Sequence, residues 1–251
     1  MSFETQFGLS EAAYRAFRPA YPASLFQQII DSLSPPHRRA VDLGAGTGLS
    51  TLHLCQWFDE VIAVEPDSEM AANLYRLSSK IEVHHHGAEA HEEEAGSVDL
   101  VTSGNAFYWM NGEVVAAKVG QWLRAQGVFA VCRYGFPQAP PAIQSVLENE
   151  LREHWNSFRH PRLIDEAYSL RIIQANPIFR RVRGVEIANV VLLSAEQLAG
   201  FLASTSYVSA YLRTIVDPVA YVSNLEAEFK DLSGLSHFPV DFSVELILAS
   251  T

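Results

Sequence analysis

The stretch that most constrains the fold is "VDLGAGTG", from Val41 to Gly48. It places three glycines, Gly44, Gly46 and Gly48, between a short apolar run and a longer amphipathic one. Glycine lets the backbone turn tightly, and it lets a ligand approach without a Cβ in the way. The loop leads into the start of a helix, where backbone N–H groups lack intrahelical partners. The sequence therefore predicts a strand, a ligand-binding loop and a helix in that order.

Residues 40–135 repeat this alternation of strand and helix. Short apolar runs predict buried strands at 39–46, 61–66, 81–87, 97–105 and 127–134. Apolar residues at helical spacing predict helices at 48–58, 67–77 and 112–127, with Asp67 as an N-cap and Gly127 as a helix end. Strands that alternate with helices become parallel strands joined by crossover helices.

The alternation stops at 135–141, where three prolines occur. Beyond them we expect helices over 142–175, a strand at 183–193, a helix at 194–212 capped by Ser194, and a last strand at 238–250. The fold class is therefore α/β: a doubly wound, mostly parallel, seven-stranded Rossmann-like sheet with helices on both faces and a helical insertion or cap after strand five. We expect one domain over 1–251, with an N-terminal lid (1–38), a binding core (39–135), the cap (136–182) and C-terminal strands and helix (183–251).

A carboxylate ends the second predicted strand, because Glu65 lies 21 residues after Gly44. At that place a carboxylate can accept hydrogen bonds from both hydroxyls of a ribose. Nicotinamide and flavin enzymes show G-x-G-x-x-G, whose third glycine would fall at position 49, which here is Leu49. The chain instead has G-x-G-x-G, with Asp42 two residues before the first glycine.

This combination, D-x-G-x-G-x-G with a strand-final acid, resembles motif I of the class I S-adenosylmethionine-dependent methyltransferases. "VIAVEPDSEMAANL" and "GAEAHEEEAGSVDLVTSGNAFYWMN" are similar to the segments that follow in that family. "YRAFRPAYPASLF" (14–26) and "FLASTSYVSAYL" (201–212) resemble one small-molecule branch, the trans-aconitate-methyltransferase-like group. The resemblance is good over 10–135. It departs at "AFYW", where Tyr108 stands in place of the branch's usual His.

The resemblance implies S-adenosylmethionine as the cofactor and a set of residues that bind it. The glycine loop would pass the amino acid part, Asp42 would support the loop or reach the ammonium through water, and Glu65 would hold the ribose. Tyr14 and Arg18 would close over the site as a lid. Adenine would be bordered by the residues that follow strands two and three, and the methyl group by Asn105. The implied cofactor-binding residues are Tyr14, Arg18, Asp42, Gly44, Ala45, Gly46, Glu65, Pro66, Met70, Ala88, Glu89 and Asn105.

Residues for the methyl acceptor follow less directly. Methyl transfer is an in-line displacement with a good leaving group, so the protein mainly aligns the reactants and excludes water. A general base is needed only if the acceptor must first lose a proton. Candidates for that base by position are Tyr108, His154, His160 and Tyr207, and none of them is assigned as catalytic. Candidate substrate-binding residues are Tyr108, Trp109, Arg133 and Tyr207.

Charge and composition exclude several other classes of protein. A net charge of −11 opposes binding to phosphate backbones, so we expect no nucleic-acid partner. The N-terminus has no basic start followed by an apolar core, and no apolar run is long enough to span a membrane. We therefore expect a cytoplasmic protein, monomeric or homodimeric, that acts on a small molecule. Two cysteines in apolar contexts indicate free thiols.

Three functions remain open. The first is a small-molecule methyltransferase, which the glycine loop, Glu65 and the N-terminal segment favour. The second is a nicotinamide-dependent oxidoreductase, which Leu49 disfavours. The third is a cofactor-binding protein without catalytic activity, which serves as a regulatory or interaction module.

One run, "VHHHGAEAHEEEAG" (83–96), resembles a metal site at first sight. Consecutive strand residues point to opposite faces, so His84, His85 and His86 cannot all converge on one ion. His84 and His86 share a face, but a metal would still need further ligands fixed nearby. We therefore expect no metal here, and interpret Gly87, Ala88 and Glu89 as one wall of the adenine pocket.

Overall fold

The computed structural model describes residues 16–251 and divides them into two compact units, which are treated separately below. The sheet unit comprises Tyr21–Tyr134, Asp165–Ile187 and Val244–Thr251. The helical unit comprises 16–20, Gly135–Ile164 and Ala188–Ser243. Both units are therefore assembled from segments that are separated in the sequence.

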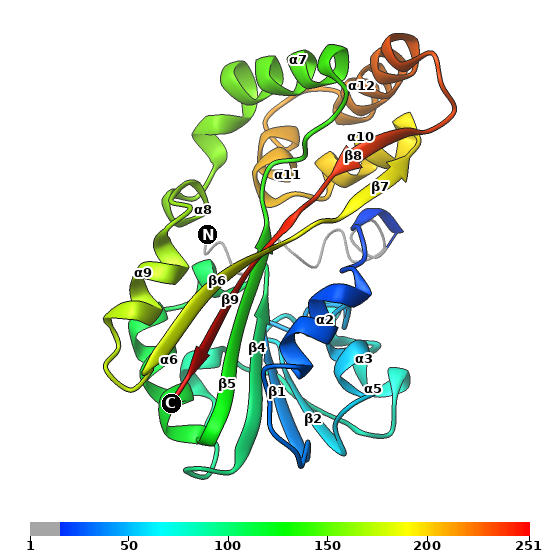
Figure 1. The fold of residues 1–251 in the computed structure, drawn as a ribbon. Coiled ribbons are helices and arrows are strands. Elements are labelled where there is room, and N and C mark those ends of the chain that lie inside the picture. Colours follow the sequence, from blue (N-terminus) through cyan, green and yellow to red (C-terminus); the bar gives the residue numbers. More distant parts are fainter. Residues whose placement is uncertain (1–15) are drawn as a thin grey trace. The chain divides into compact units, whose positions relative to one another are not determined.

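A seven-stranded sheet in the order β3-β2-β1-β4-β5-β9-β6 forms the sheet unit (Figure 1). β3, β2, β1, β4 and β5 pair in parallel, and β9 is antiparallel to both β5 and β6. This confirms the expected seven-stranded, mostly parallel sheet. The strands are β1 (Arg39–Leu43), β2 (Glu60–Val64), β3 (Ile81–His84), β4 (Val98–Gly104), β5 (Leu123–Tyr134), β6 (Arg181–Ile187) and β9 (Val244–Ser250).

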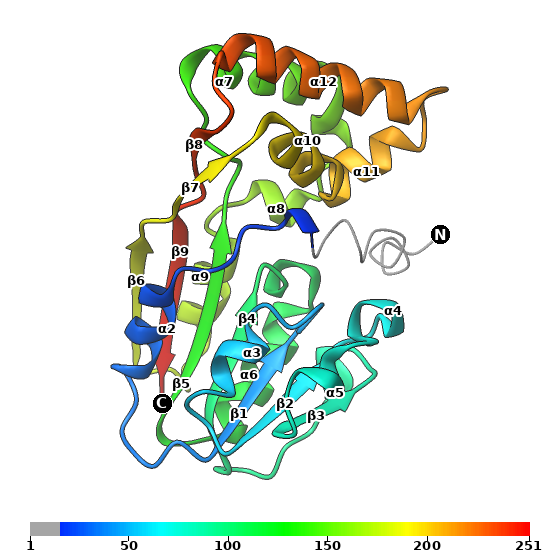
Figure 2. The same ribbon diagram turned by 90° about the vertical axis from the view of Figure 1, so that its right-hand side faces the viewer.

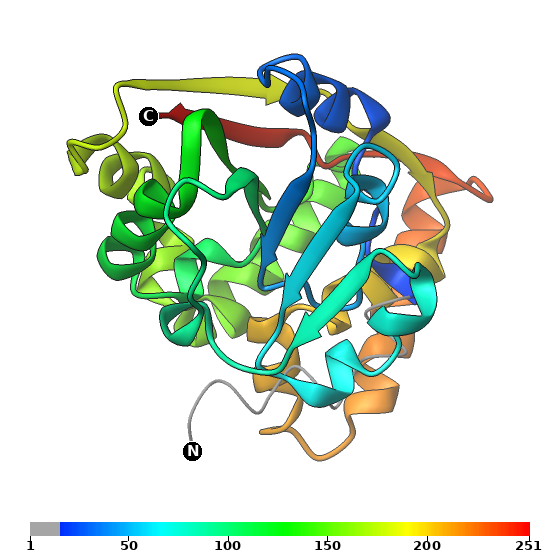
Figure 3. The same ribbon diagram turned by 90° about the horizontal axis from the view of Figure 1, so that it is seen from below.

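Helices cover both faces of this sheet, as the continuous apolar runs of the central strands require. On one face lie α6 (Gly112–Trp122) and α9 (Tyr168–Ala175), and on the other lie α2 (Ala23–Ile30), α3 (Thr51–Leu54) and α5 (Leu74–Leu77) (Figures 1 and 3). The core between α6, α9 and this face of the sheet includes Val41, Ile62, Val101, Val115, Val119, Trp122 and Phe129. This packing fixes the carboxyl ends of β1, β2 and β4 beside one another.

The helical unit packs its helices on a two-stranded antiparallel sheet of β7 (Val190–Leu193) and β8 (Phe238–Asp241) (Figure 2). Its helices are α7 (Pro141–Glu150), η5 (Leu151–Trp155), η6 (Asn156–Phe158), α8 (Pro161–Ile164), α10 (Ala195–Ala203), α11 (Ser206–Leu212) and α12 (Pro218–Ser233). Its core contains Ile143, Leu147, Trp155, Leu198, Leu202, Phe229 and Val240. The helical character expected for 142–175 is confirmed, but α9 belongs to the sheet unit.

Several predicted element boundaries are wrong within the first half of the chain. The helix expected at 48–58 is regular only over α3, and the helix expected at 67–77 divides into α4 (Ser68–Ala71) and α5. Gly127 does not end a helix. α6 ends at Trp122, and β5 begins at Leu123, which pairs with Val98 before the register shifts. Gln126 has a φ of 64°, and a Cβ on Gly127 would lie 2.9 Å from the carbonyl oxygen of Arg124, so this glycine serves a bend in the strand.

Three long elements of the second half are each divided in two. The strand expected at 183–193 is β6 and β7, and the strand expected at 238–250 is β8 and β9, which pair in different sheets. The helix expected at 194–212 breaks between α10 and α11, because the hydroxyls of Ser204 and Thr205 donate to the carbonyls of Phe201 and Leu202. The Ser194 cap is confirmed as a complete capping box. The sequence analysis missed α12.

Within residues 16–251, no helix has both the length and the apolar character needed to cross a membrane.

Candidate functional site

The glycine loop follows β1 at its carboxyl end and adopts an unusual backbone. Gly44, Gly46 and Gly48 have φ values of 72°, 55° and 92°, in the left-handed region that favours glycine. The N–H groups of Gly44 and Ala45 donate to the carbonyl of Val64 at N···O distances of 2.9 and 3.1 Å, which attaches the loop to the end of β2. The loop is therefore held by the backbone of the neighbouring strand.

The three glycines meet different surroundings. A Cβ on Gly44 would lie 2.4 Å from Ala106 Cβ, and a Cβ on Gly48 would lie 2.5 Å from Leu77 Cδ1. These two glycines are needed because the chain packs tightly against them. Among the described residues, a Cβ on Gly46 would meet only Met70 Cε, at 3.7 Å. Gly46 therefore borders open space, as a residue that contacts a ligand must.

Glu65 follows β2 and faces the same loop. Its Oε2 accepts the N–H of Gly46 at 2.8 Å, and its Oε1 accepts the N–H of Asp67 at 2.9 Å. Burial raises the pKa of this carboxyl, and the two backbone donors oppose the shift. Each carboxylate oxygen can accept a second hydrogen bond, so the group retains capacity for ligand hydroxyls.

Asp42 lies in β1 below the loop and is fully enclosed by protein. Its Oδ2 accepts the hydroxyl of Thr51 at 2.7 Å, and its Oδ1 accepts that of Thr102 at 2.8 Å. Burial is the largest cause of its raised pKa. Of the two roles expected for Asp42, this geometry fits support of the loop, since the carboxylate joins β1, β4 and the start of α3.

The residues expected around adenine differ in their surroundings. Asp67 caps α4 by accepting the N–H groups of Glu69 and Met70, and Met70 is buried beside Gly46. Pro66 is exposed. The predicted N-cap at Asp67 is thus confirmed, and it sets the direction of the chain after Glu65.

Ala88 and Glu89 lie in the short helix η3 (Ala88–Ala90) after β3. Ala88 is buried and packs in the core under α6. Glu89 is exposed, and its Oε1 accepts the N–H of Asn111 at 2.6 Å, at the N-terminus of α6. The carbonyl of Glu89 accepts a hydrogen bond from Lys118 Nζ at 2.7 Å. This pair of contacts ties η3 to α6.

Asn105 directly follows β4 and has a φ of 52°, which is uncommon for a residue with a side chain. Its Nδ2 donates to the hydroxyl of Tyr21 at 2.8 Å, and its Oδ1 accepts the N–H of Tyr134 at 3.2 Å. Tyr21 was not among the predicted site residues. The signal available was its place inside the "YRAFRPAYP" segment.

The predicted substrate-binding and lid residues that the structure describes are divided between the two units. Arg133 Nε pairs with Glu245 Oε2 at 3.0 Å, from β5 to β9. Tyr108 packs against the core of the sheet unit, and its ring centroid lies 5.2 Å from that of Trp109. Arg18 belongs to the helical unit, where it donates to the carbonyl of Ser204 at 3.1 Å. Tyr14 lies outside the described residues.

The helical unit contains a cluster of aromatic side chains around Tyr211. His154 stacks on Tyr211 with a centroid separation of 5.2 Å, and Tyr221 meets the same ring edge-on at 5.3 Å. Tyr221 also donates to Glu150 and accepts from Trp155 Nε1. Tyr207 is buried, and the guanidinium carbon of Arg159 lies 5.8 Å from its ring centroid.

His160, the fourth candidate base, has a pKa that burial and the charge of Arg162 both lower. Its Nδ1 accepts the N–H of Arg162 at 3.2 Å.

A cleft of about 880 Å³ in the sheet unit is lined by residues such as Ser32, Gln126, Arg180 and Thr251. It lies at the amino ends of β5 and β6. Open α/β sheets bind their ligands at the carboxyl ends of the strands, where Gly46, Glu65 and Asn105 are. This cleft is therefore not the candidate cofactor site.

The chain is similar to known methyltransferases in sequence and in fold. The family model of the methyltransferase domain matches residues 41–131. A protein of Dictyostelium discoideum named as a methyltransferase is 27% identical over 219 residues, which cover 84% of this chain and 80% of that protein. A protein of Saccharomyces cerevisiae named as an S-adenosylmethionine-dependent methyltransferase is 34% identical over 134 residues, which cover 51% of this chain and 46% of that protein.

Among solved structures, one described as a type II methyltransferase from Anaeromyxobacter dehalogenans superimposes with a TM-score of 0.71. The two chains are 23% identical, and the match covers 93% of this chain and 97% of the other. At that identity the likeness shows a shared fold.

Proposed function

We propose that the chain is an S-adenosylmethionine-dependent methyltransferase that transfers a methyl group from this cofactor to a small-molecule acceptor, a proposal that its similarity to methyltransferases supports. The observation that carries the proposal is the meeting of Gly46 and Glu65, where a loop with open space borders a buried carboxylate. Bound S-adenosylmethionine would supply an activated methyl group on a sulfonium sulfur. The described residues fit such a molecule, because the space beside Gly46 would accept its chain and Glu65 has unused acceptor capacity.

The residues of this chain would then bind and orient the cofactor. Glu65 would accept the hydroxyls of the ribose, as a strand-final acid does in related folds. Met70 would pack against the nucleoside, and Ala88 with Glu89 would form the wall beside adenine. Asn105, held by Tyr21 and Tyr134, would border the methyl group. This arrangement contributes alignment of the reactants and exclusion of water.

The acceptor class follows from the aromatic residues of the helical unit. We infer a small, partly apolar molecule, because the rings clustered around Tyr211 combine apolar faces with hydroxyl groups at their edges. The proposal retains the trans-aconitate-methyltransferase-like branch, on the strength of residues 14–26 and 201–212. An acidic acceptor of that branch would need a cation besides Arg133, whose charge Glu245 already balances.

Calorimetry tests the cofactor first. The chain is titrated with S-adenosylmethionine and with S-adenosylhomocysteine, and we expect saturable binding of both. Absence of binding at high micromolar concentration contradicts the proposal. A parallel fluorescence titration with reduced nicotinamide cofactor should show no binding.

Transfer is tested separately with labelled cofactor and fractions of a metabolite extract. We expect the label to appear in a small organic molecule. Cofactor binding without transfer to any fraction contradicts the enzymatic part of the proposal and favours a regulatory or interaction module.

A further inference from the structure

The segment that follows β3 brings three histidines together. One ring nitrogen from each of His84, His86 and His91 lies within 4.8 Å of the other two. His84 ends β3, His86 follows it in the connecting loop, and His91 comes directly after η3. In the sequence only His84 and His86 can be placed on one face of a strand, whereas His91 joins them through the turn made by η3.

His91 supplies an independent sign that this cluster binds something. The residue is 1% exposed, and its Nδ1 is a buried polar atom without a hydrogen-bond partner among the described residues. A buried nitrogen left unpaired costs free energy, so such atoms call for an explanation. The ring centroid of His91 lies 5.2 Å from that of His84, in an edge-to-face arrangement, and 5.3 Å from that of His86, in a stacked arrangement, so His91 contacts both of the other histidines.

A hydrogen-bond acceptor faces a nitrogen of each ring. The pairs are His84 Nε2 with Glu82 Oε1 at 2.8 Å, His86 Nδ1 with the carbonyl of Gly87 at 3.1 Å, and His91 Nε2 with Glu93 Oε1 at 2.9 Å. An acceptor at one nitrogen holds the ring proton there and leaves the second nitrogen with a lone pair. Metal-binding histidines are oriented in this way by carboxylates and carbonyls, which also raise their basicity.

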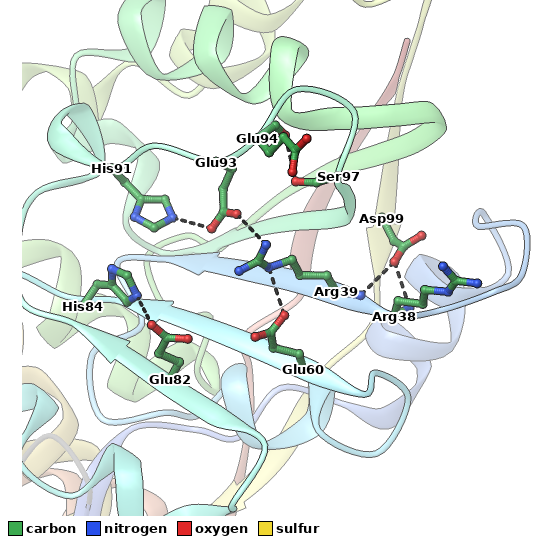
Figure 4. A network of polar contacts seen from close by, with 10 residues as sticks. All are labelled: Arg38, Arg39, Glu60, Glu82, His84, His91, Glu93, Glu94, Ser97 and Asp99. Atoms are coloured by element: carbon green, nitrogen blue, oxygen red, sulfur yellow. Dashed lines mark hydrogen bonds and ion pairs between the residues drawn. The ribbon is translucent and has the colours of Figure 1, made fainter.

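Figure 4 shows His84 and His91 next to each other with their carboxylate partners. Glu93 is itself held, because its Oε2 pairs with Arg39 Nη1 at 3.1 Å and its side chain is only 5% exposed. The contact of Glu93 with His91 Nε2 therefore fixes the position of the ring, while His91 Nδ1 has no hydrogen-bond partner among the described residues.

We propose that His84, His86 and His91 form a binding site for a divalent zinc-like ion, with a fourth position open to water. Zinc takes imidazole nitrogens at about 2.0–2.1 Å in tetrahedral geometry, which places ligand atoms about 3.4 Å apart. The ring nitrogens lie within 4.8 Å of one another, and rotation of the side chains would bring any pair that exceeds the tetrahedral spacing to that distance. Binding involves neutral imidazoles and no redox change.

The charges around the cluster are compatible with a cation. Glu82 and Glu93 provide negative charge beside two of the ligands, and Arg39 balances the second of these. Lys118 Nζ lies 3.0 Å from the carbonyl of His91, but it pairs with Glu92 at 2.6 Å. A bound ion would tie the end of β3 to the segment beyond η3, and so fix Gly87–Ala90 between its ligands.

The test uses the full chain after treatment with a chelator. Zinc is titrated by calorimetry, and cobalt is added in a parallel sample because its visible spectrum reports tetrahedral coordination. We expect one equivalent of each metal to bind and the thermal unfolding temperature to rise with metal. A metal concentration of about 100 µM is well above the dissociation constants of structural zinc sites. Absence of saturable binding at that concentration would overturn the proposal.

Substitutions of single histidines test whether these residues bind the ion. His84→Gln and His86→Gln each remove one partly exposed ligand and should lower the affinity about tenfold or more. His85→Gln is the matched control, since His85 is exposed and lies outside the cluster. The metal affinity of this variant should equal that of the parent chain. Equal affinity in all four proteins, or an equal loss in the control, would place the metal elsewhere and contradict the site.

Discussion

The carboxylate of Glu65 accepts the backbone N–H of Gly46 at 2.8 Å, across 19 residues of sequence. This bond joins the end of β2 to the one glycine of the loop that borders open space. The two parts of the expected cofactor site are therefore held in a fixed relation before a ligand arrives, which lowers the entropic cost of binding.

Replacing Glu65 by Gln should weaken S-adenosylmethionine binding about tenfold, because an amide offers one acceptor oxygen where the carboxylate offers two. Calorimetry with the purified variant measures the change. The matched control is Glu69→Gln, an exposed residue in the first turn of α4. If both variants bind as the parent does, Glu65 does not hold the ribose.

Three glycine-to-alanine variants separate ligand contact from packing. Gly46→Ala should lose cofactor affinity, because its Cβ enters the open space, while backbone strain costs about 1–2 kcal/mol of stability. Gly48→Ala should be less stable than Gly46→Ala, because its Cβ would lie 2.5 Å from Leu77 Cδ1 and 2.7 Å from Leu74 Cδ2.

Gly96→Ala is the control for strain alone. Its φ is 72°, and no described residue lies within 4 Å of the added Cβ. Urea unfolding and cofactor titration of the three proteins give the comparison. Retained affinity in Gly46→Ala would show that this side of the loop does not face the cofactor.

Asp42 should make stability depend on pH. Its pKa is raised above 3.8 by burial, so the folded chain binds more protons than the unfolded chain between the two pKa values. The free energy of unfolding contributed by this group is highest below the unfolded pKa, and it falls as pH rises through the folded pKa. Urea unfolding at several pH values above 3.8 measures the slope.

Asp42→Asn should reduce the dependence of the free energy of unfolding on pH. The dependence that remains would be due to Glu65, because burial also raises the pKa of that carboxyl. Asp59→Asn, an exposed substitution, should leave the slope as it is in the parent chain. An unchanged slope in Asp42→Asn would mean that the carboxyl keeps its ordinary pKa despite burial.

Asn105 should contribute through both its backbone and its side chain. Asn105→Gly tolerates the φ of 52° but loses the hydrogen bonds to Tyr21 and Tyr134, at a cost of about 1–2 kcal/mol. Asn105→Ala loses the same bonds and adds backbone strain, so it should be less stable than the glycine variant by about 1 kcal/mol. Denaturant unfolding ranks the two, and the reverse order would contradict a strained backbone at this position.

Local sequence signals predicted the backbone of the glycine loop and two helix caps. The spacing of Gly44, Gly46 and Gly48 indicated a loop with glycine-only geometry, and all three have positive φ. Asp67 and Ser194 were identified as helix caps, because capping depends on residues within one turn. These features rest on neighbours in sequence, which is why a single chain reveals them.

Features that depend on distant residues were not predictable in the same way. Asp42 is enclosed by Thr102, which is 60 residues away on the neighbouring strand. Tyr21 reaches Asn105 across 84 residues. Gly127 has the appearance of a helix end in the sequence, but pairing of Leu123 with Val98 extends β5 through it. Tertiary pairing overrides the local preference at each of these places.

The chain passes between its two units after Ala20, Tyr134, Ile164, Ile187 and Ser243. Neither unit is therefore a continuous piece of sequence, and no single cut of the polypeptide releases one of them whole. A recombination event that exchanged either unit as a whole would need several simultaneous joins. Evolutionary change in such a chain is expected to proceed by point substitutions within the interleaved segments rather than by exchange of a whole unit.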